Sequence, residues 1–451
     1  MKKIAIRIRV IAGIVTFMAL TASARENPGV LRLTLEDALK IAMSENLTVQ
    51  VADQEIQRQE YAKKGAYSAL FPQISIDGSY QRTIEKQTMY MDMDVAGMSI
   101  GGIKVGRDNN WVGGVNVSMP LVSASLWKSL KISALDVELA VEKARSSRIE
   151  MIEQVTQAFY GVLLADDSYR VFKQAYENAE NNYQDIKEKF EQGLVAEYDL
   201  IRADVNVRNA EPSMYGAENS LVLAHWQLKA LMGIDLGIDI ECTGSLAEYD
   251  RLLTKSHISM DLSLDNNSDL LQLDIQQGQM EKALGMRKAM YYPTLSAQFS
   301  YQYISMNNDF KIGHYRWDPY STVGISLSIP IFSGGERMSN VRQTETGLRQ
   351  LELQRENTER HLQVAVKQSY DRMNTCLKQY QAAKAGVKQA ETGYTITMKR
   401  YETGEGTLLE INDSQLSLTQ AKLNLNQSIY DYLIAESSLQ KTLGNQLTVD
   451  H

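Results

Sequence analysis

Two acidic side chains near the carboxyl end of the chain have a spacing that could act on ions. Glu410 and Asp413 lie three residues apart, so a helix would carry both carboxylates on one face. Glu410 follows Gly404 at the same distance as Asp199 follows Gly193 (410 − 404 = 6; 199 − 193 = 6). In a symmetric oligomer each acid would form a ring of like charges that attracts cations. The alternative is that they are ordinary acids of a first helical turn, where the helix dipole favours them.

The sequence shows no arrangement typical of an enzyme. Its 5 histidines are scattered, with neither an i, i+4 pair nor an HExxH motif. Gly334-Gly335 follows a predicted strand and precedes a predicted helix, but the Lys-Ser/Thr of a phosphate-binding loop is missing. We therefore expect no catalytic residue, no metal site and no cofactor.

The first residues are typical of a secretory signal. A basic start is followed by an apolar run from Val10 to Leu20 and by the small-residue site Ala22-Ser23-Ala24, which predicts a signal peptide over residues 1–24. The alternative, an N-terminal membrane anchor, is disfavoured because the apolar run is too short to span a bilayer.

Composition excludes several classes of protein. With only 2 cysteines, Cys242 and Cys376, the chain is no disulfide-stapled scaffold. The formal net charge of −8 argues against nucleic acid as a partner.

The elements that must position the acids occur twice. Leu70-Phe71-Pro72 is matched by Tyr291-Tyr292-Pro293 at an offset of 221 (293 − 72), and Phe190-Glu191-Gln192-Gly193 by Tyr401-Glu402-Thr403-Gly404 at 211 (404 − 193). A duplication of this size decides the architecture. It predicts a first repeat over 25–232, a linker or equatorial segment over 233–268, a second repeat over 269–444 and a tail over 445–451.

Each repeat contains two segments in which apolar and polar residues alternate, as in Val323-Gly324-Ile325-Ser326-Leu327. This pattern predicts four amphipathic strands, at about 73–84, 111–121, 294–304 and 320–331. Strands of about 9–12 residues cross a bilayer at a tilt. The alternative, half-buried strands of a soluble sandwich, would need more strands and a second sheet.

The segments that join these strands are predicted to be cell-surface loops, Glu85–Asn110 and Met306–Pro319. Four aromatic residues near the strand ends are expected to form an interfacial girdle. They are Trp111, Tyr315, Trp317 and Tyr320.

Long helices complete each repeat. From Leu126 to Phe190 there is no proline and one glycine, and apolar residues recur near every 3.6 positions. Gly193 is expected to end this helix, and a second helix returns over Tyr198–Leu231. The second repeat predicts the same hairpin, with helices over Arg337–Tyr401 and from beyond Gly404 to Leu443. Helical evidence alone would also fit an antiparallel coiled-coil rod.

Four strands cannot close a membrane barrel, and lipid does not tolerate open sheet edges. Two, three or four copies would give about eight, twelve or sixteen strands, and closed membrane barrels begin at about eight. The residues alone predict an oligomer and leave its copy number open.

The chain resembles the TolC-like outer-membrane efflux proteins from Leu33 to Gly444. The resemblance is carried by the duplicated strand-flanked hairpins, by Leu194-Val195-Ala196-x-x-Asp199-Leu200 and by Tyr401-x-x-Gly404-x-Gly406-Thr407-Leu408-Leu409-Glu410-Ile411-x-Asp413. It implies an α+β membrane protein that forms, as a homotrimer, a 12-stranded outer-membrane β-barrel continuous with a 12-helix periplasmic tunnel.

The resemblance also implies roles for particular residues. The pore constriction, or gate, would comprise Glu410, Asp413, Tyr401 and Asp199. The tip turns that dock an adaptor would contain Gly193, Gly404 and Gly406. The family archetype has an arginine where this chain has Gly406, which puts in doubt a salt-bridge latch through that arginine.

From these features we expect a passive outer-membrane exit duct of a tripartite efflux system for small molecules, with no enzymatic activity. Its expected partners are outer-membrane lipid, a periplasmic adaptor (membrane fusion) protein and an inner-membrane RND or ABC transporter. Two alternatives remain: a type I secretion duct for polypeptides, which would use the same tunnel, and a periplasmic adaptor or coiled-coil scaffold. An adaptor is disfavoured because it usually has one helical hairpin between lipoyl-like and barrel domains.

Overall fold

The computed structural model describes residues 30–90, 94–95, 98–99, 102–250, 253 and 262–445. The predicted signal peptide and the tail beyond residue 445 lie outside the described residues. The chain divides into two compact units. Unit 1 comprises residues 1–51, 145–267 and 361–451, and unit 2 comprises residues 52–144 and 268–360, so both repeats contribute to each unit.

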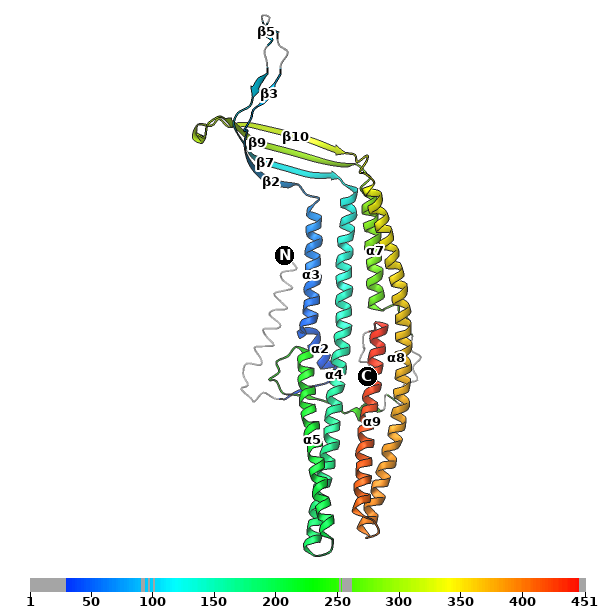
Figure 1. The fold of residues 1–451 in the computed structure, drawn as a ribbon. Coiled ribbons are helices and arrows are strands. Elements are labelled where there is room, and N and C mark those ends of the chain that lie inside the picture. The colour runs from blue at the N-terminus through cyan, green and yellow to red at the C-terminus, as the bar shows by residue number, and fades with distance from the viewer. Residues whose placement is uncertain are drawn as a thin grey trace, which may run out of the picture. The chain divides into compact units, whose positions relative to one another are not determined.

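Unit 2 contains a four-stranded antiparallel sheet in the order β10-β9-β7-β2 (Figure 1). Its strands are β2 (Gln73–Arg82), β7 (Asn109–Val122), β9 (Thr294–Asn307) and β10 (Asp318–Ser328). Each strand overlaps one predicted from alternation, with ends that differ by up to three residues. In the described residues β2 and β10 are the two edges of this sheet.

The register aligns the alternation of all four strands. Ile74 is opposite Val117, Val117 opposite Phe299, and Phe299 opposite Val323. Because directly opposed residues share a face, these side chains form one apolar row across the sheet, and Val323 in it is 85% exposed.

The next row lies on the other face and is polar. It consists of Ser75, Asn116, Ser300 and Thr322. Hydrogen bonds connect side chains on this face: the Ser300 hydroxyl donates to Asn116 Oδ1 at 2.8 Å, and Asn116 Nδ2 donates to Asp77, two residues along β2 from Ser75, at 2.8 Å.

The long loop between β2 and β7 contains short strands that the sequence did not predict. β3 (Gln87–Met89) pairs with β6 (Ile103–Val105), and β4 (Asp94–Val95) pairs with β5 (Met98–Ser99). The remaining residues of this loop between 91 and 101 lie outside the described residues.

The prediction that Tyr315 belongs to an interfacial aromatic girdle is wrong. Tyr315 is 9% exposed, and its hydroxyl donates to the Asp309 carbonyl in the loop between β9 and β10, which also contains the short helix η2 (Ile312–His314). Trp111 packs against Tyr80 with ring centroids 4.3 Å apart. Tyr80 also contacts Phe310 of the loop between β9 and β10, with ring centroids 6.1 Å apart. Trp317 remains 42% exposed.

The helices of unit 2 are α7 (Ser268–Ala289), most of α3 (Leu47–Ser68) and the first parts of α4 (Ala124–Glu191) and α8 (Glu336–Glu402). Polar contacts connect α7 to both long helices. Gln279 donates to Asp136 of α4 at 2.8 Å, and Lys288 pairs with Glu345 of α8 at 3.1 Å.

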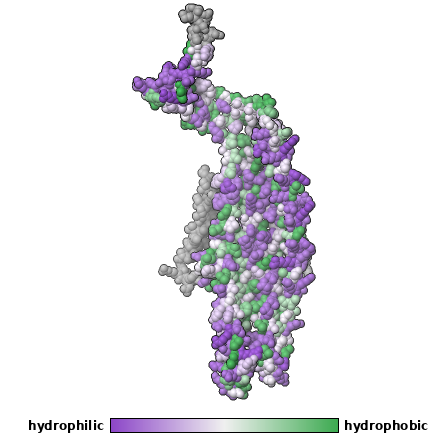
Figure 2. All heavy atoms as spheres, viewed as in Figure 1, coloured by the Kyte–Doolittle hydropathy of each residue, from purple (hydrophilic) through white to green (hydrophobic). Residues whose placement is uncertain are grey.

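Unit 1 contains the rest of α4 and α8 together with α5 (Glu197–Met232) and α9 (Leu408–Leu443) (Figure 1). The two hairpins agree with the predicted helices to within a few residues, and α4 has 68 residues without a break. The visible face of the helices is mostly hydrophilic, with apolar residues scattered among the polar ones (Figure 2).

The core of unit 1 lies where the linker packs against the helices. β1 (Leu31–Leu33) pairs in parallel with β8 (Ile240–Cys242), beside α2 (Leu35–Glu45) and the short helix η1 (Leu246–Tyr249). Phe159, Leu228, Leu246 and Leu439 are almost completely buried there. Lys229, 4% exposed, donates to two linker carbonyls at 2.6 and 3.1 Å.

The two cysteines are free thiols. Burial raises the pKa of Cys242 to about 12, and burial also raises the pKa of Cys376. Neither thiol is therefore activated as a nucleophile.

Candidate functional site

The turn between α8 and α9 carries most of the residues expected in the gate. Gly404 adopts a φ of 78°, in the left-handed region that favours glycine. The next two backbone N–H groups, of Glu405 and Gly406, donate to the Arg400 carbonyl at 2.8 and 2.9 Å and end α8. A β-carbon on Gly406 would lie 3.0 Å from the Tyr401 nitrogen. This tight turn explains why a glycine stands there.

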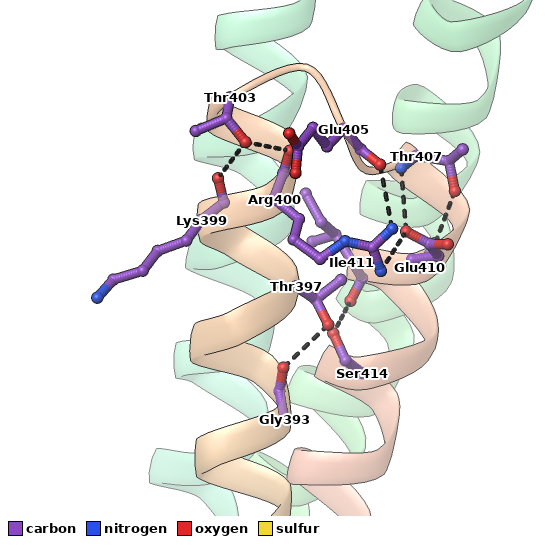
Figure 3. Close-up of polar contacts among 10 residues, drawn as sticks. All are labelled: Gly393, Thr397, Lys399, Arg400, Thr403, Glu405, Thr407, Glu410, Ile411 and Ser414. Carbon is purple, nitrogen blue, oxygen red and sulfur yellow. Dashed lines mark hydrogen bonds and ion pairs between the residues drawn. The ribbon is translucent and has the colours of Figure 1, made fainter.

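Glu410 caps α9. Its Oε2 accepts a bond from the Thr407 N–H at 3.2 Å, and the Glu410 N–H donates to the Thr407 hydroxyl at 3.3 Å, which together form a capping box. The same Oε2 lies 3.8 Å from Nη1 of Arg400 on α8 (Figure 3). Asp413 follows on the same helix and is exposed. Glu410 therefore stabilises the start of α9, in addition to any role it has in a gate.

The turn between α4 and α5 is built in the same way. Gly193 adopts a φ of 73°, and the Leu194 N–H donates to the Lys189 carbonyl at 2.9 Å. α5 begins after Ala196, which offers no side-chain cap, and Asp199 lies in its first turn. Asp199 is half-buried, whereas Asp413 is exposed.

A small apolar cluster joins the two hairpins near their turns. Ile186 of α4, Ala203 of α5 and Leu408 of α9 are buried together, and Tyr401 packs against them. Burial raises the pKa of the Tyr401 hydroxyl, and the charge of Asp199 acts in the same direction. Tyr401 is thus part of the contact between the two hairpins.

A lysine stands beside the same tyrosine. The ammonium of Lys189 lies 5.3 Å from the centre of the Tyr401 ring and 2.6 Å from Asp185. Sequence reasoning missed both Lys189 and Arg400, because basic residues in the last turn of a helix are common and serve the helix dipole. The only available signal was that both stand within four residues before a turn glycine (193 − 189 = 4; 404 − 400 = 4).

A shallow groove of about 180 Å³ lies between α4, α5 and α9 a few turns from the tips. Small and amide side chains line it, among them Ala175, Asn206, Asn209 and Gln415. The buried Oδ1 of Asn412, which also lines the groove, accepts no hydrogen bond from the described residues. A buried acceptor of this kind suits a partner that brings a donor.

The part of the chain that the structure describes contains no group of three or more His, Cys, Asp or Glu side chains that could hold a metal ion. None of the described helices combines the length and apolar character needed to cross a membrane.

Comparison with known proteins identifies relatives along most of the chain. The family model described as outer membrane efflux protein matches residues 38–234 and 260–445. The chain is 22% identical over 333 residues to outer membrane protein TolC of Vibrio cholerae, which covers 73% of this chain and 76% of that protein. It is 24% identical over 351 residues to the alkaline protease secretion protein AprF of Pseudomonas aeruginosa, with 76% and 72% covered.

Solved structures share the fold. The outer membrane channel CmeC of Campylobacter jejuni superposes with a TM-score of 0.68 at 20% identity, over 91% of this chain and 85% of that one. The open-state outer membrane channel MtrE of Neisseria gonorrhoeae gives a TM-score of 0.70 at 17% identity, over 92% and 90%.

These findings confirm the resemblance seen in the sequence. Relatives of this type are passive channels of the outer membrane rather than enzymes. The chain belongs to the outer membrane efflux protein family.

Proposed function

We propose that the protein is the passive exit duct of a tripartite efflux system that moves small molecules out of the cell. It forms a homotrimer in which twelve strands, four from each copy, close a barrel and twelve helices line a periplasmic tunnel. The observation that carries this proposal is the amphipathic sheet with two free edges. Its apolar row, from Ile74 to Val323, is largely exposed in one chain. Lipid on that face and a neighbouring copy at each edge would satisfy both features.

The tips of the hairpins form the proposed gate. Glu410 and Asp413, repeated by threefold symmetry, would surround the axis with negative charge. Tyr401 packs against the apolar cluster that joins the hairpins, and Asp199 lies in the first turn of α5. The turns at Gly193, Gly404 and Gly406 and the groove that contains Asn412 are the proposed contacts of a periplasmic adaptor. An inner-membrane RND or ABC transporter would supply the energy, since a passive duct supplies none.

The gate is tested by single-channel conductance in planar bilayers. We expect Glu410→Gln combined with Asp413→Asn to raise the conductance and to weaken block by Ca²⁺ from the periplasmic side, because the ring loses its negative charge. Exposed acids at a distance from the tips, Glu356 and Asp371 on α8, serve as the matched control. Unchanged conductance and block in the double variant would show that Glu410 only caps α9 and that Asp413 is only an exposed surface acid.

A second candidate function is a type I secretion duct for polypeptides. It is favoured by the similarity to AprF, whose name states that it serves protease secretion. A deletion strain separates the two functions. Loss of the efflux duct raises sensitivity to small toxic compounds, whereas loss of a secretion duct removes a polypeptide from the culture medium.

A further inference from the structure

One cation is built into the turn between α8 and α9. Arg400 stands in the last turn of α8, and its side chain turns toward the start of α9 (Figure 3). Its Nη2 donates to the Glu405 carbonyl at 3.1 Å, and its Nη1 lies 3.8 Å from Glu410 Oε2. The guanidinium is therefore held between the turn and the first acid of the proposed gate.

Both partners of this pair are fixed before they meet. The Arg400 guanidinium is held by its bond to the Glu405 carbonyl, and the carboxylate of Glu410 is held by the capping box with Thr407. An exposed ion pair usually contributes little because two long side chains lose freedom. Here much of that freedom is already lost for other reasons, so the pair persists although both side chains are about half exposed, 50% and 44%.

We propose that Arg400 is the counter-charge of Glu410 and sets how strongly the hairpin tip attracts cations. The proposal rests on the proposed function, in which Glu410 faces the constriction. Arg400 acts as a positioning residue: it orients the carboxylate and neutralises part of the field that a passing ion meets. Asp413, exposed on the same helix, retains its charge and becomes the stronger attractor of the two acids.

The test is cation block of the purified trimer. A divalent cation ~8 Å from a unit positive charge, at an effective dielectric of ~60, is repelled by an energy that corresponds to about tenfold in affinity. We therefore expect Arg400→Gln to tighten Ca²⁺ block about tenfold and to shift the reversal potential in a salt gradient toward cation selectivity.

Lys399→Gln is the matched control. It removes the same charge from the neighbouring residue, whose side chain points away from the turn (Figure 3), so we expect block within about twofold of the wild type. Arg400→Lys keeps the charge and should stay close to the wild type if charge decides the effect. In the Glu410→Gln background we expect Arg400→Gln still to tighten block about tenfold, because the guanidinium repels the passing cation directly.

The results separate this inference from the proposed gate. Suppose that Ca²⁺ blocks Arg400→Gln and Lys399→Gln with the same affinity, while the double variant Glu410→Gln with Asp413→Asn is still blocked more weakly than the wild type. The proposed gate then stands and the role of Arg400 is overturned. If the acid variants leave block unchanged, the proposed gate itself fails. Thermal melting of each trimer is measured alongside, and a lower melting temperature for Arg400→Gln with unchanged block also overturns the inference, since it indicates a purely structural pair.

Discussion

The two faces of the sheet should respond very differently to a charge. Val323 lies at the centre of β10, 85% exposed, in the apolar row that spans all four strands. Thr322 is its chain neighbour in the polar row with Ser300 and Asn116. If the apolar row faces lipid, Val323→Lys places a charge near the middle of the bilayer, at a cost of about 2–4 kcal/mol.

Three copies multiply that cost. A trimer would lose about 6–12 kcal/mol of folding free energy through Val323→Lys, as much as the whole stability of a typical domain, ~5–15 kcal/mol. Thr322→Lys should stay within about 0.5 kcal/mol per copy, because its ammonium reaches the aqueous lumen. The pair is matched in size, charge and strand position, so only the face differs.

The assay is folding into lipid vesicles followed by urea titration, with assembled trimer measured in parallel from outer-membrane fractions. We expect a large downward shift of the urea midpoint and little assembled trimer for Val323→Lys, and nearly normal values for Thr322→Lys. Equal losses for the two variants, or a greater loss for Thr322→Lys, would refute the assignment of the faces.

Four further variants test the helical unit by thermal melting. Gly444→Ala should destabilise it by more than about 2 kcal/mol, because φ is 75° and the new β-carbon would overlap the Asn266 carbonyl, whereas Gly193→Ala, at φ 73° in open space, should cost only about 1–2 kcal/mol; equal costs would contradict this. Lys229→Met should cost about 2–4 kcal/mol, since two linker carbonyls lose their donor, and an unchanged melting temperature would oppose that reading. Burial raises the folded-state pKa of Glu436, so its contribution is favourable below the unfolded-state pKa and is lost as pH rises through the folded value. Glu436→Gln should therefore melt above the wild type at pH 7–8 and converge with it toward pH 4, and a difference independent of pH would argue against burial as the cause.

Much of the fold was predictable because its signals are local and repeated. The alternation of apolar and polar residues around Val323 predicts a strand, and the proline-free stretch after Leu126 predicts a helix. Comparing the two copies also predicted the turns at Gly193 and Gly404, both of which adopt positive φ.

The contacts of the site were less predictable because they depend on how the chain turns. Glu410 and Asp413 were singled out by spacing, yet the capping box and Arg400 give them different surroundings. Tyr315 was assigned to a membrane interface by its residue type, but a carbonyl of its own loop binds its hydroxyl. In both cases the partners are set by the conformation of a turn or loop, which the sequence does not reveal.

The duplication also built two equivalent joints in unit 1, each an asparagine side chain that donates to the carbonyl of a returning helix. Asn46 caps the start of α3 and donates to the Leu231 carbonyl at 2.7 Å, and Asn267 donates to the Thr442 carbonyl, also at 2.7 Å. Asn46 precedes α3 and Asn267 precedes α7, and each binds the last turn of a helix that returns from a hairpin turn, α5 or α9. A glycine with a φ of 75° ends both returning helices.

These joints explain why the repeats have two offsets. The asparagines are 221 residues apart, as are the prolines before the first strands, whereas the carbonyls they bind are 211 apart (267 − 46 = 221; 442 − 231 = 211). The segment from each asparagine to the proline before the first strand therefore keeps its length in both copies, as does the segment from each tip glycine to the final glycine (404 − 193 = 211; 444 − 233 = 211). The loop between paired strands accounts for nearly all of the difference between the two offsets. Geometry at the joint requires this: the asparagine amide and the carbonyl must meet in both copies, so a change of length in either segment would break the bond, while a loop beyond the strands is free to vary.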